Sequence, residues 1–166
     1  MIESSPEPRP SIDWNLWMQW VLATTLAWLV GWAIMGDLAI GLAVGVAQWL
    51  PLRQLGRSAI WWIPASTIGW LAGWAIIVPG WLVPPNASGL STVLSGLILG
   101  LTIGLAQWLV MRRLTRRAGW WIFASTVGWT VGLTGLLGAS LVGTVVGVLT
   151  GFMLDFLQRE RTVNFP

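Results

Sequence analysis

The sequence contains no cysteine, histidine, tyrosine or lysine. Without cysteine there is no thiol nucleophile, no disulfide and no iron–sulfur ligand. Without histidine, the commonest general base and the commonest ligand for zinc and haem are missing. Without lysine, no Schiff base can form with retinal or pyridoxal phosphate. These absences exclude many enzyme classes, and we expect no metal site in this protein.

Acidic residues are also scarce, with six Asp and Glu in 166 residues. None falls at the middle of the apolar segments described below, where a carboxylate normally marks a proton or ion path. The chain also lacks a pair of carboxylates at working distance on one helix and a glycine-rich phosphate loop ending in lysine. We therefore predict that the protein is neither an enzyme nor a proton-coupled transporter. The residues identify no cofactor.

Charged residues of both signs make up only 9% of the chain, whereas hydrophobic residues make up 55%. A soluble domain usually carries about 25% charged residues. The deficit is too large for a surface that faces water, so the composition predicts an integral membrane protein in contact with the lipid bilayer. The sequence pI of about 11.5 does not indicate nucleic-acid binding, because the arginines cluster at the ends of apolar segments.

Six segments are apolar enough to be spanning helices, which need roughly 20 residues each. They cover approximately residues 16–35, 38–56, 61–79, 91–112, 119–137 and 140–157. Several connections are short, so consecutive helices should be antiparallel neighbours. The sequence predicts an all-α, six-span transmembrane helical bundle, in one domain over residues 14–158. Residues 1–13 form a polar N-terminal tail, and residues 159–166 form a cytoplasmic C-terminal tail.

All nine basic residues are arginine, and six spans would place all of them on one side of the membrane. The opposite side would carry a single acid, Asp37. Arginine-rich connections mark the cytoplasmic side, so we predict cytoplasmic N- and C-termini in an inner membrane of the plasma or thylakoid type. A further hypothesis is that four clustered arginines bind anionic lipid headgroups: Arg112, Arg113, Arg116 and Arg117.

Two local interactions follow from spacing near the chain ends. Ser11 or Asp13 is placed to cap the first helix, because both residue types accept hydrogen bonds from free backbone N–H groups. Asp155 precedes Arg159 by four residues, a spacing at which opposite charges pair on one helix face.

The chain contains an internal repeat. Residues 41–74 and 100–133 align without a gap, and 20 of the 34 positions are identical. Each copy contains Gln-Trp-Leu, an arginine-rich turn and Trp-Trp-Ile-x-Ala-Ser-Thr-x-Gly-Trp. Partial copies at residues 20–32 and 143–150 make the unit a helix pair used three times, over about residues 16–57, 58–113 and 118–157. Three parallel pairs are compatible with a pseudo-threefold axis along the membrane normal.

Small residues recur at every fourth position in the predicted helices, which places them on one face. Helix backbones approach closely along such a face, so we expect these residues to pack helix against helix. In the first helix of each pair they are Ala23, Ala27 and Gly31; Ala65, Gly69 and Gly73; and Ala124, Gly128 and Gly132. In the second helices they are Gly41 and Gly45; Gly96, Gly100 and Gly104; and Gly143, Gly147 and Gly151.

A second stripe, of indole and hydroxyl side chains, lies about 100° around the first helix of each pair. Its members are Trp20, Thr24, Trp28 and Trp32; Trp62, Ser66, Trp70 and Trp74; and Trp121, Ser125, Trp129 and Leu133. We favour packing as its role, since aromatic residues at helical spacing usually fill a core. The alternative is a notch for a flat apolar ligand such as a carotenoid, chlorin or quinone, formed by Ser66, Ser125, Trp70 and Trp129.

Gln48 and Gln107 each follow a glycine of the packing face by three residues, so their amides should point into the bundle. Thr150 takes the equivalent place in the third pair. An amide buried in hydrocarbon must find a hydrogen-bond partner. We favour interhelical bonding, worth about 1 kcal/mol. The alternative is a polar ring that binds a substrate or supplies an amide oxygen to the magnesium of a chlorin.

The combination of Gln-Trp-Leu, an arginine turn and Trp-Trp-Ile-x-Ala-Ser-Thr-x-Gly-Trp resembles a set of small multi-spanning membrane proteins of cyanobacteria and some neighbouring bacteria. The resemblance covers about residues 20–155 and implies no activity. Abundant packing surface with little chemistry favours a structural or partner-binding protein, such as a small subunit of a membrane complex or a homo-oligomer. The alternatives are a pigment- or lipid-binding protein and a facilitator for a small neutral solute.

Overall fold

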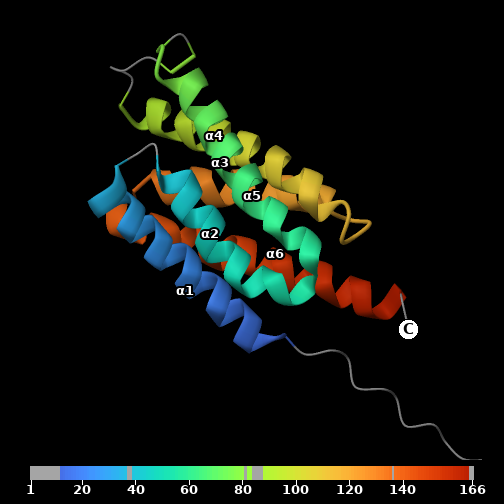
Figure 1. Cartoon of the computed structure of the whole chain (residues 1–166). Helices are drawn as coiled ribbons and strands as arrows, with labels where there is room; N and C mark the ends of the chain where they lie inside the picture. Colours follow the sequence, from blue (N-terminus) through green and yellow to red (C-terminus); the bar gives the residue numbers. More distant parts are fainter. Residues whose placement is uncertain (1–11, 37–38, 81, 84–87, 136, 165–166) are drawn as a thin grey trace, which may run out of the picture.

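The computed structural model describes residues 12–36, 39–80, 82–83, 88–135 and 137–164. These residues form six α-helices and no strand, which confirms the predicted all-α bundle (Figure 1). The helices are α1 (Trp14–Val30), α2 (Ile40–Leu52), α3 (Trp62–Ile77), α4 (Ser88–Met111), α5 (Gly119–Leu133) and α6 (Val142–Asn164). The proposed cap Ser11 and the acid Asp37 lie outside the described residues.

Short irregular helices extend or join these elements. A π-helix, Gly31–Met35, continues α1. The 3₁₀ segments Arg53–Leu55 and Arg57–Trp61 connect α2 to α3, and Ala139–Leu141 precedes α6. Gly56 separates the first two 3₁₀ segments with a φ of 140°, a conformation that residues with a side chain rarely adopt.

The first turn of α1 is held by two carboxylates. Asp13 caps the helix as predicted, because its side chain accepts a hydrogen bond from the backbone N–H of Leu16 at 3.1 Å. The backbone N–H of Asp13 in turn donates to the carboxylate of Asp155 in α6 at 2.9 Å. Asp155 also forms the predicted ion pair with Arg159. Helix α6 continues to Asn164, so most of the predicted C-terminal tail is helical.

The six helices form a closed ring, because each packs against its neighbours in sequence and α1 packs against α6. The start of α1, the end of α6 and the arginine-rich connections α2–α3 and α4–α5 lie together (Figure 1). We call this the arginine end of the ring. The described parts of the other three connections lie at the glycine-turn end, where several glycines have positive φ: Gly36, Gly80, Gly135 and Gly138.

The glycine faces lie at the helix contacts, as the spacing predicts. A Cβ atom built on Gly100 of α4 would lie 2.5 Å from the Cα of Thr126 in α5. One built on Gly69 of α3 would lie 2.6 Å from the Cα of Ile103 in α4. These distances are far below normal contact, so glycine is required for the observed approach of the backbones.

The outer surface of the ring is apolar. Leu26, Ile68 and Phe123 are about three-fifths exposed, at 60%, 63% and 59%. Among the described residues, four helical segments are long and apolar enough to cross a membrane: Trp14–Ala33, Arg57–Ile77, Gly89–Met111 and Ala139–Arg159. Helices α2 and α5 are shorter, with 13 and 15 residues. This arrangement is compatible with an integral membrane protein.

Candidate functional site

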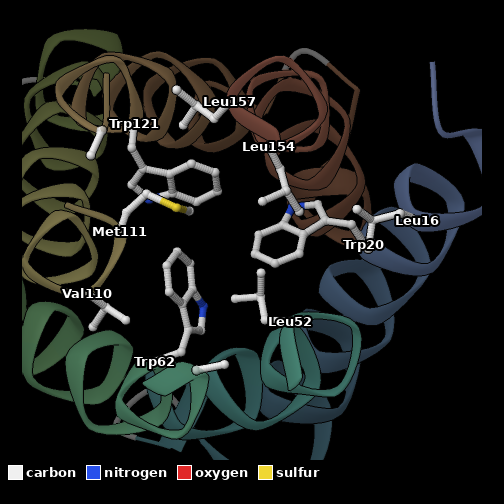
Figure 2. Close-up of a cluster of buried hydrophobic side chains, with 11 residues drawn as sticks. Leu16, Trp20, Leu52, Trp62, Val110, Met111, Trp121, Leu154 and Leu157 are labelled. Carbon is white, nitrogen blue, oxygen red and sulfur yellow. The ribbon is translucent and has the colours of Figure 1, made fainter. Parts of the chain in front are cut away.

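Three tryptophans, one from the first helix of each pair, meet on the axis of the ring near the arginine end. We call Trp20, Trp62 and Trp121 the first tryptophan triangle. Their ring centroids lie 5.9, 5.7 and 5.2 Å apart, and each pair of rings is close to perpendicular. Figure 2 shows the three side chains pointing toward one another between the surrounding helices. All three are at most 1% exposed, so they fill the axis here.

A second tryptophan triangle lies two helical turns further along the axis. It consists of Trp28, Trp70 and Trp129, whose ring centroids lie 6.4, 5.8 and 5.3 Å apart. These three side chains are at most 5% exposed. The favoured prediction that the indole stripes pack is therefore confirmed at six positions.

The two triangles enclose a polar layer, formed by Thr24, Ser66, Ser125, Gln48, Gln107 and Thr150. All six side chains are buried, at 3% exposure or less. In the first pair, the amide nitrogen of Gln48 donates to the hydroxyl of Thr24 at 3.0 Å. Its amide oxygen accepts from the indole N–H of Trp62, at 3.0 Å, in the next pair. Gln48 therefore connects three helices.

Gln107 makes the equivalent bonds in the second pair. Its amide nitrogen donates to the hydroxyl of Ser66 at 2.9 Å, and its oxygen accepts from the indole of Trp121 at 2.9 Å. A weaker contact of 3.4 Å joins the Gln107 nitrogen to the Gln48 oxygen. The buried amides thus bond across helices, as the favoured prediction has it, and they hold the indoles of the first triangle in place.

The third pair closes the layer with a smaller side chain. The hydroxyl of Thr150 accepts from the indole N–H of Trp20 at 2.9 Å and donates to the carbonyl of Val146 at 2.6 Å. The hydroxyl of Ser125, at 1% exposure, has no hydrogen-bond partner among the described residues. This difference follows from the sequence, where Thr150 stands at the position of Gln48 and Gln107.

The structure brings the six proposed ligand-binding residues together around one small cavity of about 10 Å³. They are Gln48, Gln107, Ser66, Ser125, Trp70 and Trp129. This volume is close to that needed by a single water molecule, and far below the roughly 300–1,000 Å³ of pockets for larger ligands. A solute moving along the axis would also have to displace the buried indoles of both triangles.

A larger pocket lies beyond the second triangle, at the glycine-turn end. We call it the terminal pocket; its volume is about 330 Å³. Trp28 and Trp70 border it on the axial side, and Trp32 and Trp74 line it one turn further along their helices. The third pair has Leu133 where the other two pairs have Trp32 and Trp74. A third triangle of indoles therefore lacks one member, and the pocket lies beside the position of the missing indole.

Polar groups in the terminal pocket are few. The buried indole nitrogen of Trp74 has no hydrogen-bond partner among the described residues. Ser95 of α4 supplies a hydroxyl to the lining. Ser95 and Leu133 also line a neighbouring hollow of about 350 Å³, the hydroxyl chamber, which adds Ser91 and Thr92 from α4. The repeat pattern contains one signal for this pocket, the substitution of Leu133 for tryptophan.

No known family model, curated protein or solved structure matches this chain. The chemistry of the site must therefore be read from its own residues.

The four clustered arginines surround the connection between α4 and α5, and all four are exposed. The guanidinium of Arg112 lies 5.1 Å from the ring centre of Trp108, within the range of a cation–π contact. Arg113, Ser58 and Trp61 are among the residues that line an apolar groove of about 370 Å³ between α3 and α4. The cluster is separated from the terminal pocket by the length of the bundle.

Proposed function

We propose that this protein is a non-enzymatic integral membrane protein that binds an amphipathic, lipid-like molecule at the glycine-turn end of its bundle. The observation that carries this proposal is the terminal pocket, where Leu133 interrupts the third layer of indoles. Of the functions that the sequence leaves open, this one corresponds to the lipid- or pigment-binding alternative. The proposed ligand site, however, lies beyond the second triangle, about two helical turns from the polar layer.

The composition of the terminal pocket favours an apolar ligand portion. Its volume of about 330 Å³ lies at the lower end of the range for small-molecule sites, which are mostly apolar with a few placed polar groups. The indoles of Trp28, Trp70 and Trp74 provide broad apolar surface at low conformational cost. The indole N–H of Trp74, which is buried and has no partner among the described residues, can donate to a carbonyl or hydroxyl oxygen of the ligand.

The hydroxyl chamber favours a polar head on the same molecule. It shares Ser95 and Leu133 with the terminal pocket and adds the hydroxyls of Ser91 and Thr92. An apolar portion in the pocket and a hydroxyl- or carbonyl-bearing head in the chamber would match the chemical character of both linings. The π-helix that carries Trp32 is a further indication, because π-helical turns are frequent at functional sites.

Native mass spectrometry of the protein purified from its own host membranes in mild detergent tests the proposal. We expect one bound amphiphile per chain in the wild type. Leu133→Trp should complete the third triangle, occupy part of the pocket and remove the bound mass while the protein stays folded. Trp74→Phe keeps an aromatic six-membered ring but removes the N–H donor and the five-membered ring, so affinity for the recovered amphiphile should fall at least about fivefold, the equivalent of one hydrogen bond.

Ile68→Trp is the matched control for the added indole, because Ile68 is exposed on the outer face of α3. It should retain the bound amphiphile at the wild-type level. A Leu133→Trp protein that still carries the wild-type amphiphile would contradict the proposal. Recovery of a stoichiometric membrane protein in place of an amphiphile would instead favour the structural, partner-binding role.

A further inference from the structure

The polar layer is complete in two helix pairs and incomplete in the third. In the first two pairs, a glutamine amide nitrogen donates to the hydroxyl one turn above the first-triangle tryptophan: Gln48 to Thr24, and Gln107 to Ser66. The third pair has Thr150 at this place, and its hydroxyl donates to the carbonyl of Val146. Ser125, which corresponds to Thr24 and Ser66, therefore has no equivalent donor.

The space that a third glutamine amide would occupy lies next to Ser125. The cavity of about 10 Å³ there is lined by Gln48, Gln107, Ser66, Ser125 and Thr150 among its polar residues. A cavity of this size accommodates one water molecule, and a buried water requires two to four polar partners. Apolar cavities stay dry, but this lining is rich in amide and hydroxyl groups.

We propose that one structural water molecule binds in this cavity and replaces the missing glutamine amide. The hydroxyl of Ser125 donates to the water oxygen. The water donates to Thr150 and to the amide oxygen of Gln107, each of which has one lone pair beyond those used by Trp20 and Trp121. The water thereby closes the polar layer around the axis.

The sign of one stability change distinguishes a hydrated cavity from a dry one. In a dry cavity the Ser125 hydroxyl is unsatisfied, so Ser125→Ala would raise the melting temperature measured in detergent. With the water bound, the same change removes a hydrogen bond, and we expect the melting temperature to fall by about 2–4 °C. Ser66→Ala removes a direct bond to Gln107 and provides the matched reference for such a fall.

X-ray hydroxyl-radical footprinting locates the water directly, because radicals formed from bound water label adjacent side chains. Trp129 lines the cavity, whereas the equally buried Trp62 of the first triangle lines neither this cavity nor the terminal pocket. We expect stronger labelling of Trp129 than of Trp62. In Thr150→Gln, the added amide should displace the water and reduce labelling of Trp129 to the level of Trp62.

An unchanged or raised melting temperature of Ser125→Ala overturns the proposal, as does equal labelling of Trp129 and Trp62 in the wild type. If Thr150→Gln does not fold, the comparison of Ser125→Ala with Ser66→Ala still decides the question. None of these measurements depends on a ligand in the terminal pocket, so their outcome is independent of the proposed function.

Discussion

The indole N–H of Trp121 donates a hydrogen bond to the side-chain oxygen of Gln107 at 2.9 Å, which joins α5 to α4. The corresponding bond between Trp62 and Gln48, at 3.0 Å, joins α3 to α2. Each glutamine therefore accepts from the tryptophan of the following helix pair. Glutamine is costly to bury in an apolar bundle. Here its side-chain oxygen is the acceptor that orients the indoles of Trp62 and Trp121.

Gln107→Leu should destabilise the bundle strongly. The substitution leaves the indole of Trp121 and the hydroxyl of Ser66 without this partner inside the ring, and each buried group left unsatisfied costs about 1–3 kcal/mol. We expect a loss of at least this size in the free energy of unfolding, measured by SDS titration in mixed micelles. Gln54→Leu, on the exposed 3₁₀ segment, is the matched control and should change stability little; equal losses would refute a special role for Gln107.

Gly100→Ala and Gly128→Ala should have opposite effects although both glycines lie inside helices. An alanine Cβ at position 100 would lie 2.5 Å from the Cα of Thr126, so α4 and α5 must separate. At position 128 the nearest atom would be 3.6 Å away, an ordinary contact. Gly100→Ala should cost about 1–3 kcal/mol. Gly128→Ala should be neutral or gain up to about 1 kcal/mol from helix propensity.

These two variants are compared by thermal unfolding in the same detergent. A Gly128→Ala protein as unstable as Gly100→Ala would show that the glycines act through backbone flexibility. That outcome would contradict the explanation that Gly100 is required because α4 and α5 approach closely.

Asp155→Ala should release the first turn of α1 from α6. The substitution removes the acceptor for the backbone N–H of Asp13 and the partner of Arg159. We expect the amides at the start of α1 to exchange with solvent roughly 5–150-fold faster, which corresponds to about 1–3 kcal/mol of lost local stability. Hydrogen exchange followed by mass spectrometry measures this change.

Asp155→Asn is the matched control, because its side-chain oxygen can still accept from Asp13 while the charge is lost. Exchange in Asp155→Asn should lie between the wild type and Asp155→Ala. If exchange at the start of α1 is the same in all three proteins, the contact does not hold the helix.

Single-cysteine labelling should establish the orientation predicted from the arginines, since the chain contains no cysteine of its own. Gln54→Cys lies at the arginine end and Ser140→Cys at the glycine-turn end, and both positions are exposed. A membrane-impermeant maleimide added to intact cells, with the protein in the plasma membrane, should label Ser140→Cys. Gln54→Cys should react with the maleimide only after the cells are permeabilised. The reverse pattern would place the terminal pocket on the cytoplasmic side.

Local features of this protein could be predicted from sequence because they depend on neighbours along one helix. The four-residue spacing of glycines predicts close helix contacts, and Gly69 and Gly100 make them. The position of Gln48 and Gln107 on the glycine face predicts buried amides, and both are 3% exposed. The cap by Asp13 follows from the same local logic.

The sequence by itself determined six helices, their packing faces and their inward polar residues, since helix periodicity decides which side chains share a face. The tertiary structure decided the order of helices around the ring and the contact between Asp13 and Asp155, which are 142 residues apart. It also decided that the indole stripes meet as triangles instead of forming a lateral notch. Closure of α1 against α6 brings the three stripes onto one axis. The volume of the terminal pocket beside Leu133 depends on all of the helices that surround it.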